Sequence, residues 1–196
     1  MLQVDMLDKN ESLNTHVERP EDIRPKFNYY GYNKGSAIVR FMSLIFNDFD
    51  SSITEYLHQK GFHNSKPADL FEAVNRNGSA VVGRVATVSE IMNSWVNQPG
   101  FPLLTLNLMK INDQWILNAT QEHFSFMGNG NESAKWWIPI TVTSGNSISF
   151  DPQNMLGWLS DQNKSVAFEV TDEFAASWFI GNLQAASKLK SCKILI

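Results

Sequence analysis

The chain has 196 residues, a formal net charge of -4, one cysteine and a hydrophobic content of 43%. This composition excludes a disordered chain, and the absence of a basic, aromatic-rich patch gives no support to nucleic-acid binding. No apolar run is long enough to predict a membrane helix, no signal peptide is recognised, and the single Cys192 excludes an internal disulfide and a thiolate zinc cluster.

Two helices are predicted in the first third of the chain. The first spans about residues 34–46, where apolar side chains recur on one face. The second begins near Asp50 and Ser51, which are typical N-cap residues, and stops at Gly61. Its side chains predicted to point inward are Ile53, Tyr56 and Leu57.

Two further helices are predicted before residue 101. Pro67 suits the first turn of one helix, and residues 75–78 end it. The other starts at Thr87, whose spacing to Glu90 is that of a capping box, and ends at Pro99-Gly100. The side chains predicted to be buried are Leu70, Phe71, Val74, Val88, Ile91, Met92, Trp95 and Val96.

From about residue 101 the hydrophobic period changes to that of strands. Leucines alternate with polar residues over 104–108, and Asn112-Asp113 predicts a turn into a partner strand over 115–120. Further strands are predicted over residues 136–143, 166–170 and 178–180, with Pro139 at an edge or a bulge. Short antiparallel strands at this density predict a small β-sandwich.

Five segments resemble one family. Residues 32–42, Tyr-Asn-Lys-Gly-Ser-Ala-Ile-Val-Arg-Phe-Met, resemble the Y-x-K-G-(A/S)-x-(V/I)-(L/V/I)-R-M-(L/M) segment of the aminopeptidase N family of zinc aminopeptidases, the gluzincins. Residues 89–102 are similar to its EIM-x-x-W-x-x-Q-x-G-(Y/F)-P run, and residues 136–140 to its W-x-(I/V)-P-(I/L) strand. Residues 2–7 and 20–23 resemble the segments that precede the family tyrosine. The match runs in order from about residue 2 to about residue 184.

The resemblance implies an α+β fold with two domains. Residues 1–100 would be the C-terminal helical part of a thermolysin-like catalytic domain, and residues 101–184 a small antiparallel β-sandwich. Residues 185–196 resemble nothing in the family and form a divergent tail, as a splice variant or a truncated gene model would have.

The resemblance also implies one catalytic residue, Tyr32. In the family the matching hydroxyl donates a hydrogen bond to the oxyanion of the tetrahedral intermediate. The family's zinc is held by an H-E-x-x-H motif and a glutamate of the next helix, and a G-x-M-E-N loop holds the substrate amine. Neither motif occurs in the chain, and its histidines, at positions 16, 58, 63 and 123, lack the required spacing. No metal or cofactor is therefore expected to bind this chain alone.

Four further residues are interpreted structurally. Lys34 is predicted to be solvated near a helix start, and Gly35 to allow close packing. Trp136 and Trp137 would point to opposite faces of a strand, so they cannot form a flat carbohydrate platform. One of them is expected in the core and the other at a domain interface.

Three functions remain open from the sequence. The first is a fragment or short isoform of a zinc metalloaminopeptidase, which hydrolyses peptide N-terminal residues but is inactive in this form. The second is a non-catalytic relative that binds peptide or a full-length aminopeptidase through surfaces otherwise covered by missing domains. The third, a free β-sandwich binding module, leaves the helices without a purpose. Five N-x-S/T sequons, at Asn10, Asn77, Asn118, Asn131 and Asn163, favour an extracellular or plasma-membrane parent, with the cytoplasm as the alternative.

Overall fold

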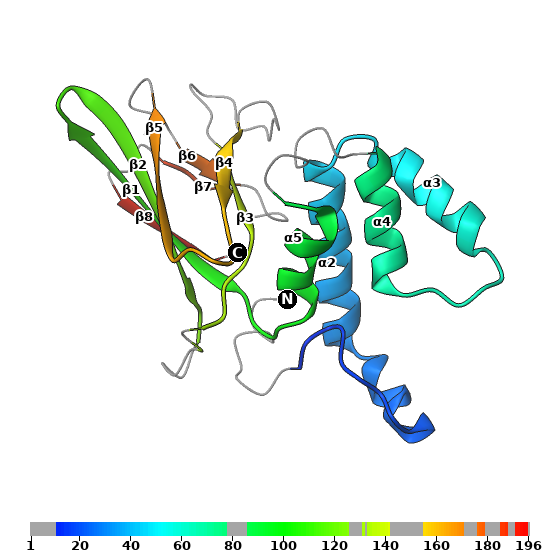
Figure 1. The fold of residues 1–196 in the computed structure, drawn as a ribbon. Coiled ribbons are helices and arrows are strands. Elements are labelled where there is room, and N and C mark those ends of the chain that lie inside the picture. Colours follow the sequence, from blue (N-terminus) through cyan, green and yellow to red (C-terminus); the bar gives the residue numbers. More distant parts are fainter. Residues whose placement is uncertain are drawn as a thin grey trace.

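Helices precede antiparallel strands in this chain, as the α+β prediction required. The computed structural model describes residues 11–77, 86–125, 131, 133–141, 155–170, 176–178, 185–187 and 191–195. Two 3-10 turns, η1 (Pro20–Asp22) and η2 (Arg24–Lys26), lead into the helices α2 (Tyr29–Ile45), α3 (Phe49–Lys60), α4 (Pro67–Asn77) and α5 (Val88–Val96). In Figure 1, α5 lies next to the strands and α3 is the helix farthest from them.

The apolar faces of the helices are mostly those that the sequence predicts. Every residue predicted to be buried in α4 and α5 is buried, except Leu70, which is half-buried. Leu57 is a correction, because its side chain is 60% exposed. Helix α3 stands at the outer end of the helical layer (Figure 1), so only one side of it finds a packing partner. Helical spacing gives the period of a buried face but not its width.

Helix α5 starts with the predicted capping box. The Thr87 hydroxyl accepts a hydrogen bond from the Glu90 amide, and the Glu90 carboxylate accepts one from the Thr87 amide at 2.7 Å. The hydrogen bonds that the Thr87 amide and hydroxyl donate to this carboxylate hold the pKa of Glu90 below its ordinary value. The capping box therefore stabilises the start of α5 most when the Glu90 carboxyl is ionised.

Thr87→Ala should lower the melting temperature by about 2–4 °C at neutral pH. Because the folded-state pKa of Glu90 is lowered, its stabilisation is present above the unfolded-state pKa and is lost as the pH falls through the folded-state value. The difference in melting temperature between the variant and the parent should therefore be smaller at pH 3 than at pH 7. Thermal melts at both pH values measure it. Thr54→Ala, at an exposed site in α3, is the control and should show no such pH dependence.

A long hairpin forms the centre of the main sheet. Strands β1 (Pro102–Ile111) and β2 (Gln114–His123) pair along their whole length through the predicted turn. Asn112 and Asp113 have φ of 48° and 65°, as a two-residue type I′ turn requires. Buried and less buried residues alternate along β1 from Pro102 to Asn107, which confirms the strand period.

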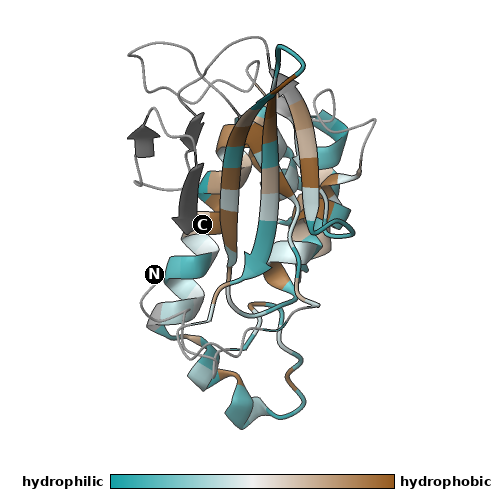
Figure 2. Ribbon diagram, turned by 90° about the vertical axis from the view of Figure 1, so that its left-hand side faces the viewer, coloured by the Kyte–Doolittle hydropathy of each residue, from teal (hydrophilic) through white to brown (hydrophobic). Residues whose placement is uncertain are grey.

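The remaining strands complete three antiparallel sheets. They are β3 (Ile138–Thr141), β4 (Met155–Leu159), β5 (Ser165–Val170), β6 (Ala176–Trp178), β7 (Ala185–Ser187) and β8 (Ser191–Leu195). The strand orders are β5-β2-β1-β8, β3-β4 and β6-β7. The register of β3 shifts after Ile140, next to Pro139, as the predicted bulge implies. Residues 142–143 and 179–180 of the predicted strands lie outside the described residues. Figure 2 shows apolar and polar bands alternating along the main sheet, with the helices behind it.

Tryptophans join the helical and strand halves into one core. The Trp95 ring of α5 lies 5.1 Å from Phe41 and 6.4 Å from Trp136, between ring centroids. The Trp95 indole donates to the Trp137 carbonyl at 2.9 Å. Trp136 and Trp137 are both buried, so neither forms part of a surface platform. The buried apolar residues of both halves form a single cluster.

Within the residues that the structure describes, none of the helices is long and apolar enough to cross a membrane.

Candidate functional site around Tyr32

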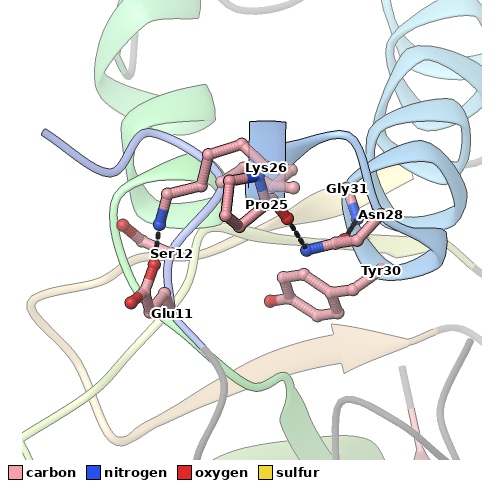
Figure 3. A pocket seen from close by; sticks show the side chains of 8 residues that line it. Glu11, Ser12, Pro25, Lys26, Asn28, Tyr30 and Gly31 are labelled. Atoms are coloured by element: carbon pink, nitrogen blue, oxygen red, sulfur yellow. Dashed lines mark hydrogen bonds and ion pairs between the residues drawn. The ribbon is translucent and has the colours of Figure 1, made fainter. Parts of the chain in front are cut away.

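The start of helix α2 is fixed by a compact cap. The Asn28 side chain accepts a hydrogen bond from the Gly31 amide at 2.8 Å and donates one to the Pro25 carbonyl at 2.9 Å (Figure 3). A Cβ on Gly31 would lie only 3.0 Å from the Lys26 carbonyl oxygen, so this position favours glycine. The cap starts α2 at Tyr29, five residues before the predicted residue 34. Asn28, a strong N-cap residue, is the sequence signal that could have placed this start correctly.

Tyr32 lies in the first turns of α2 and points outward. It is 66% exposed, whereas the apolar residues Ile38, Phe41 and Met42 of the same helix are buried. Its backbone amide donates to the Asn28 carbonyl, so the Cα of Tyr32 is held by the cap. The phenol is thus accessible to a molecule that approaches α2, on a backbone that is held in place.

The structure overturns the prediction for Lys34. Its side chain is 2% exposed, and its ammonium donates to the Gly100 carbonyl at 2.7 Å and to the Tyr30 hydroxyl at 3.1 Å. The ammonium also lies 5.4 Å from the centroid of the Tyr30 ring. Lys34 is therefore not solvated. It ties the inner face of α2 to the connection between α5 and β1.

This bond sets the direction of Tyr32. Residues two apart on a helix differ by about 200° around its axis, so Lys34 and Tyr32 project to opposite sides. Anchoring Lys34 on the inner face therefore limits rotation of the helix and keeps the phenol outward. The signal was in the sequence: Lys34 falls on the same helical face as Ile38, Phe41 and Ile45.

The connection that Lys34 contacts is itself held by the strand half. Gly100 has φ of 76°, and a Cβ there would lie 2.3 Å from Nε2 of His123, at the end of β2. Nδ1 of His123 accepts a hydrogen bond from the Asn131 amide at 2.7 Å. The position of α2 thus depends on residues from both halves of the chain.

A hollow of about 280 Å³ lies beside the cap (Figure 3). It is lined by Glu11, Ser12, Leu13, Pro25, Lys26, Asn28, Tyr30 and Gly31. Glu11 and Lys26 form an ion pair in it, and the hydrogen bond from Lys26 lowers the pKa of the Glu11 carboxyl. The Glu11 carboxylate is therefore already paired with the Lys26 ammonium. This hollow is polar, but its carboxylate is not available to bind a substrate amine.

One side of α2 carries an apolar hollow of about 400 Å³. Gly35 and Val39 line it on α2, with Leu70 and Phe71 opposite them on α4. The prediction for Gly35 was wrong, because a Cβ there would meet no atom of the described residues within 4 Å beyond the backbone of its own helix. Gly35 therefore opens onto this hollow and is not a close-packing glycine.

The described residues do not fit a zinc ion. No group of three or more histidine, cysteine, aspartate or glutamate side chains comes together in the described part of the chain. His16 is exposed and lies near Glu18, whereas His123 packs on Gly100 and on the Trp136 ring. No catalytic step through a metal follows from these residues.

Comparison with known proteins relates the chain to one peptidase family. Residues 1–95 match the Peptidase family M1 domain. The chain is a relative of the M1 aminopeptidases. The thyrotropin-releasing hormone-degrading ectoenzyme of Rattus norvegicus is 28% identical over 197 residues, which cover 93% of this chain and 18% of that protein. Aminopeptidase N of Plutella xylostella is 28% identical over 171 residues, covering 86% of this chain and 18% of its own length.

A protein of Thermoplasma volcanium gives a similar match. The Tricorn protease-interacting factor F2 of Thermoplasma volcanium is 28% identical over 143 residues, or 72% of this chain and 17% of the relative. The chain therefore spans less than a fifth of the length of the curated relatives it matches. These matches confirm the resemblance to the M1 aminopeptidase family that the sequence motifs indicated.

Proposed function

We propose that the chain is a fragment or short isoform of a zinc metalloaminopeptidase, with Tyr32 as its inherited oxyanion donor and without catalytic activity in this form. The observation that carries the proposal is the exposed phenol of Tyr32, on a helix start fixed by Asn28 and Lys34. The M1 match over residues 1–95 includes this position. The peptidase activity belongs to the full-length relatives, and we assign it to the parent of this chain only as part of this proposal.

Tyr32 would act on a peptide carbonyl placed within hydrogen-bond reach of its hydroxyl. As negative charge develops on the carbonyl oxygen, the phenol O–H donates a hydrogen bond to it. Such a donor typically accelerates a reaction by about 10²–10³, and only when a nucleophile and a positioned carbonyl are present. Because the H-E-x-x-H and G-x-M-E-N motifs are absent from the sequence, this chain supplies neither of these and no anchor for the substrate amine.

The proposal includes the division of the chain. Residues 1–100 would be the helical end of a thermolysin-like catalytic domain, residues 101–184 a β-sandwich domain, and residues 185–196 a divergent tail. The family match ends at residue 95 and α5 ends at Val96, which supports the first boundary. In the proposed tail, the backbone of β8 pairs with β1.

The purified 196-residue chain should contain no stoichiometric zinc and should not hydrolyse amino-acid p-nitroanilides, with or without added zinc chloride. The reason is that one hydrogen-bond donor cannot replace a nucleophile and an amine anchor. Elemental analysis and a colorimetric rate assay measure both quantities. One zinc ion per chain together with turnover that Tyr32→Phe abolishes would contradict the proposed inactivity.

The alternative is a non-catalytic protein that binds peptide or a full-length aminopeptidase. The apolar hollow beside Gly35 and the 44% exposure of Val39 favour such an association. Sedimentation velocity of the chain, alone and mixed with a full-length M1 aminopeptidase, distinguishes association from a monomer.

We place the parent protein at the extracellular face or the plasma membrane, with the cytoplasm as the alternative. Asn131 and Asn163 are exposed and outside the strands, where a glycan can be attached, whereas Asn118 lies within β2 between two paired strands.

A further inference from the structure

A third hollow, of about 450 Å³, lies between the helical half and the strand half. It is formed between α5 and two strand-half loops and shares no lining residue with the hollows described above. One wall is the exposed side of α5 with Glu90, Asn93 and Asn97. The other wall carries Lys135, before β3, and Asp161, in the turn between β4 and β5.

Both walls are held by buried or part-buried hydrogen bonds. The Ser94 hydroxyl accepts from the Trp137 amide at 3.0 Å, and the Gln98 amide donates to the Lys135 carbonyl at 2.7 Å, which fixes the loop to α5. The Gln121 amide donates to the carbonyls of Ser160 and Asn163, both at 3.0 Å, which fixes the turn. The hollow is therefore formed before any ligand arrives, which lowers the entropic cost of binding.

The charged groups of the hollow remain available. In the described part of the chain, neither the Lys135 ammonium nor the Asp161 carboxylate takes part in an ion pair, although they line the same hollow. One Glu90 oxygen accepts from Thr87, and the other has no donor among the described residues. The Asn93 side-chain amide makes no hydrogen bond with any described group.

These groups follow one another along α5. Glu90 lies in the first turn of the helix, Asn93 and Asn97 follow on the same side, and Gln98 holds the Lys135 backbone at the far end. The seven residue steps from Glu90 to Asn97, the C-cap residue of α5, span about 10 Å at the rise of a helix. A carboxylate and two amides therefore lie in that order over the length of about three extended residues, and the backbone of Lys135 is held beyond the second amide.

We infer that this hollow binds a short peptide with free ends. The ligand's α-ammonium pairs with Glu90, and its carboxylate pairs with Lys135. Its peptide groups bond the Asn93 amide and the N–H groups of the Asn97 amide, whose oxygen accepts from the Asn14 amide at 2.9 Å. The volume falls within the usual range of ligand sites. Asp161 disfavours the carboxylate end of the ligand, because it carries the same charge. The Gln121 amide binds the carbonyls of Trp136 and Ser160, and so holds the turn that contains Asp161 beside Trp136, the neighbour of Lys135. This inference goes beyond Tyr32 and does not require the chain to hydrolyse anything.

Titration of the ¹⁵N-labelled full chain with triglycine at low ionic strength tests the inference. Backbone signals of α5 and of residues 133–135 and 160–162 should shift with a dissociation constant of about 1 mM. N-acetyl-triglycine amide, which lacks both charged ends, should bind at least about fivefold more weakly. Equal binding of the blocked peptide, shifts confined to other surfaces, or no binding at 10 mM triglycine would each overturn the inference.

Substitutions in the hollow should change the affinity for triglycine in opposite directions. Glu90→Gln keeps the capping acceptor and Lys135→Met keeps the side-chain length, and each should weaken triglycine binding about threefold to tenfold. Asp161→Asn should strengthen binding, because it removes the negative charge near the ligand carboxylate. Glu18→Gln and Lys110→Met, which change the same charges at exposed sites outside the hollow, are the controls. Unchanged affinity in both Glu90→Gln and Lys135→Met would also overturn the inference.

Discussion

Replacing Gln121 by leucine is expected to lower the free energy of unfolding by about 3–5 kcal/mol. Gln121 is 1% exposed in β2. Its amide oxygen accepts from the Trp136 amide at 2.8 Å, and its nitrogen lies 3.0 Å from the carbonyl oxygens of Trp136, Ser160 and Asn163. Leucine has a similar volume, so the loss comes from backbone groups that are left without partners and not from a cavity.

Urea unfolding measures this change directly. Gln114→Leu, at an exposed position of the same strand, is the matched control and should change the free energy of unfolding by less than about 0.5 kcal/mol. Gln121→Glu should also destabilise, because it places a carboxylate opposite three carbonyl oxygens. That loss should diminish at acidic pH, where burial favours the protonated form and the new O–H restores one donor. A Gln121→Leu variant as stable as the parent would contradict the proposed role of this amide.

Gly100→Ala is expected to destabilise the fold by about 2–5 kcal/mol. The backbone at Gly100 has φ of 76°, a conformation in which alanine is strained. The new methyl group would also lie 2.3 Å from Nε2 of His123. Either the imidazole or the α5–β1 connection must move. Movement of the connection would also displace the Gly100 carbonyl that accepts from Lys34.

Gly35→Ala is the matched control for this prediction, with the opposite sign. Gly35 lies within α2 and a Cβ there meets no atom within 4 Å, so alanine should stabilise the chain by about 0.5–1 kcal/mol. Calorimetry of both variants measures the contrast. The steric argument for Gly100 would be wrong if the two variants melted at the same temperature. Hydrogen exchange at the start of α2 would show whether Gly100→Ala also loosens the backbone that carries Tyr32.

Local chemistry made several elements predictable. Thr87 and Glu90 form their capping box from residues three apart, and Asn112-Asp113 adopts positive φ because both residue types tolerate it. The buried face of α5 follows from helical spacing. Tyr32 was singled out by resemblance, and its catalytic role stays a prediction.

Other positions were missed because they depend on contacts between distant segments. Gln121 continues the buried row of Leu117 and Ala119 in β2, so strand spacing could have placed it inside. Its four backbone partners, however, come from two later segments. Leu57 has the right helical phase but lies at the end of the helical layer, where the described residues leave its side chain 60% exposed.

The sequence by itself determined the order of helices and strands, the capping box of α5, the turn between β1 and β2, and the resemblance to the M1 aminopeptidases. These features depend on residues a few positions apart, or on motifs in order. The N-cap that it predicted for α3 at Asp50 and Ser51 was wrong, because α3 starts at Phe49. Only the tertiary structure decided that Lys34 is buried and that Gly35 is open, because burial depends on what packs against a face. The ammonium of Lys34 can leave water because a carbonyl 66 residues away accepts its hydrogen bond.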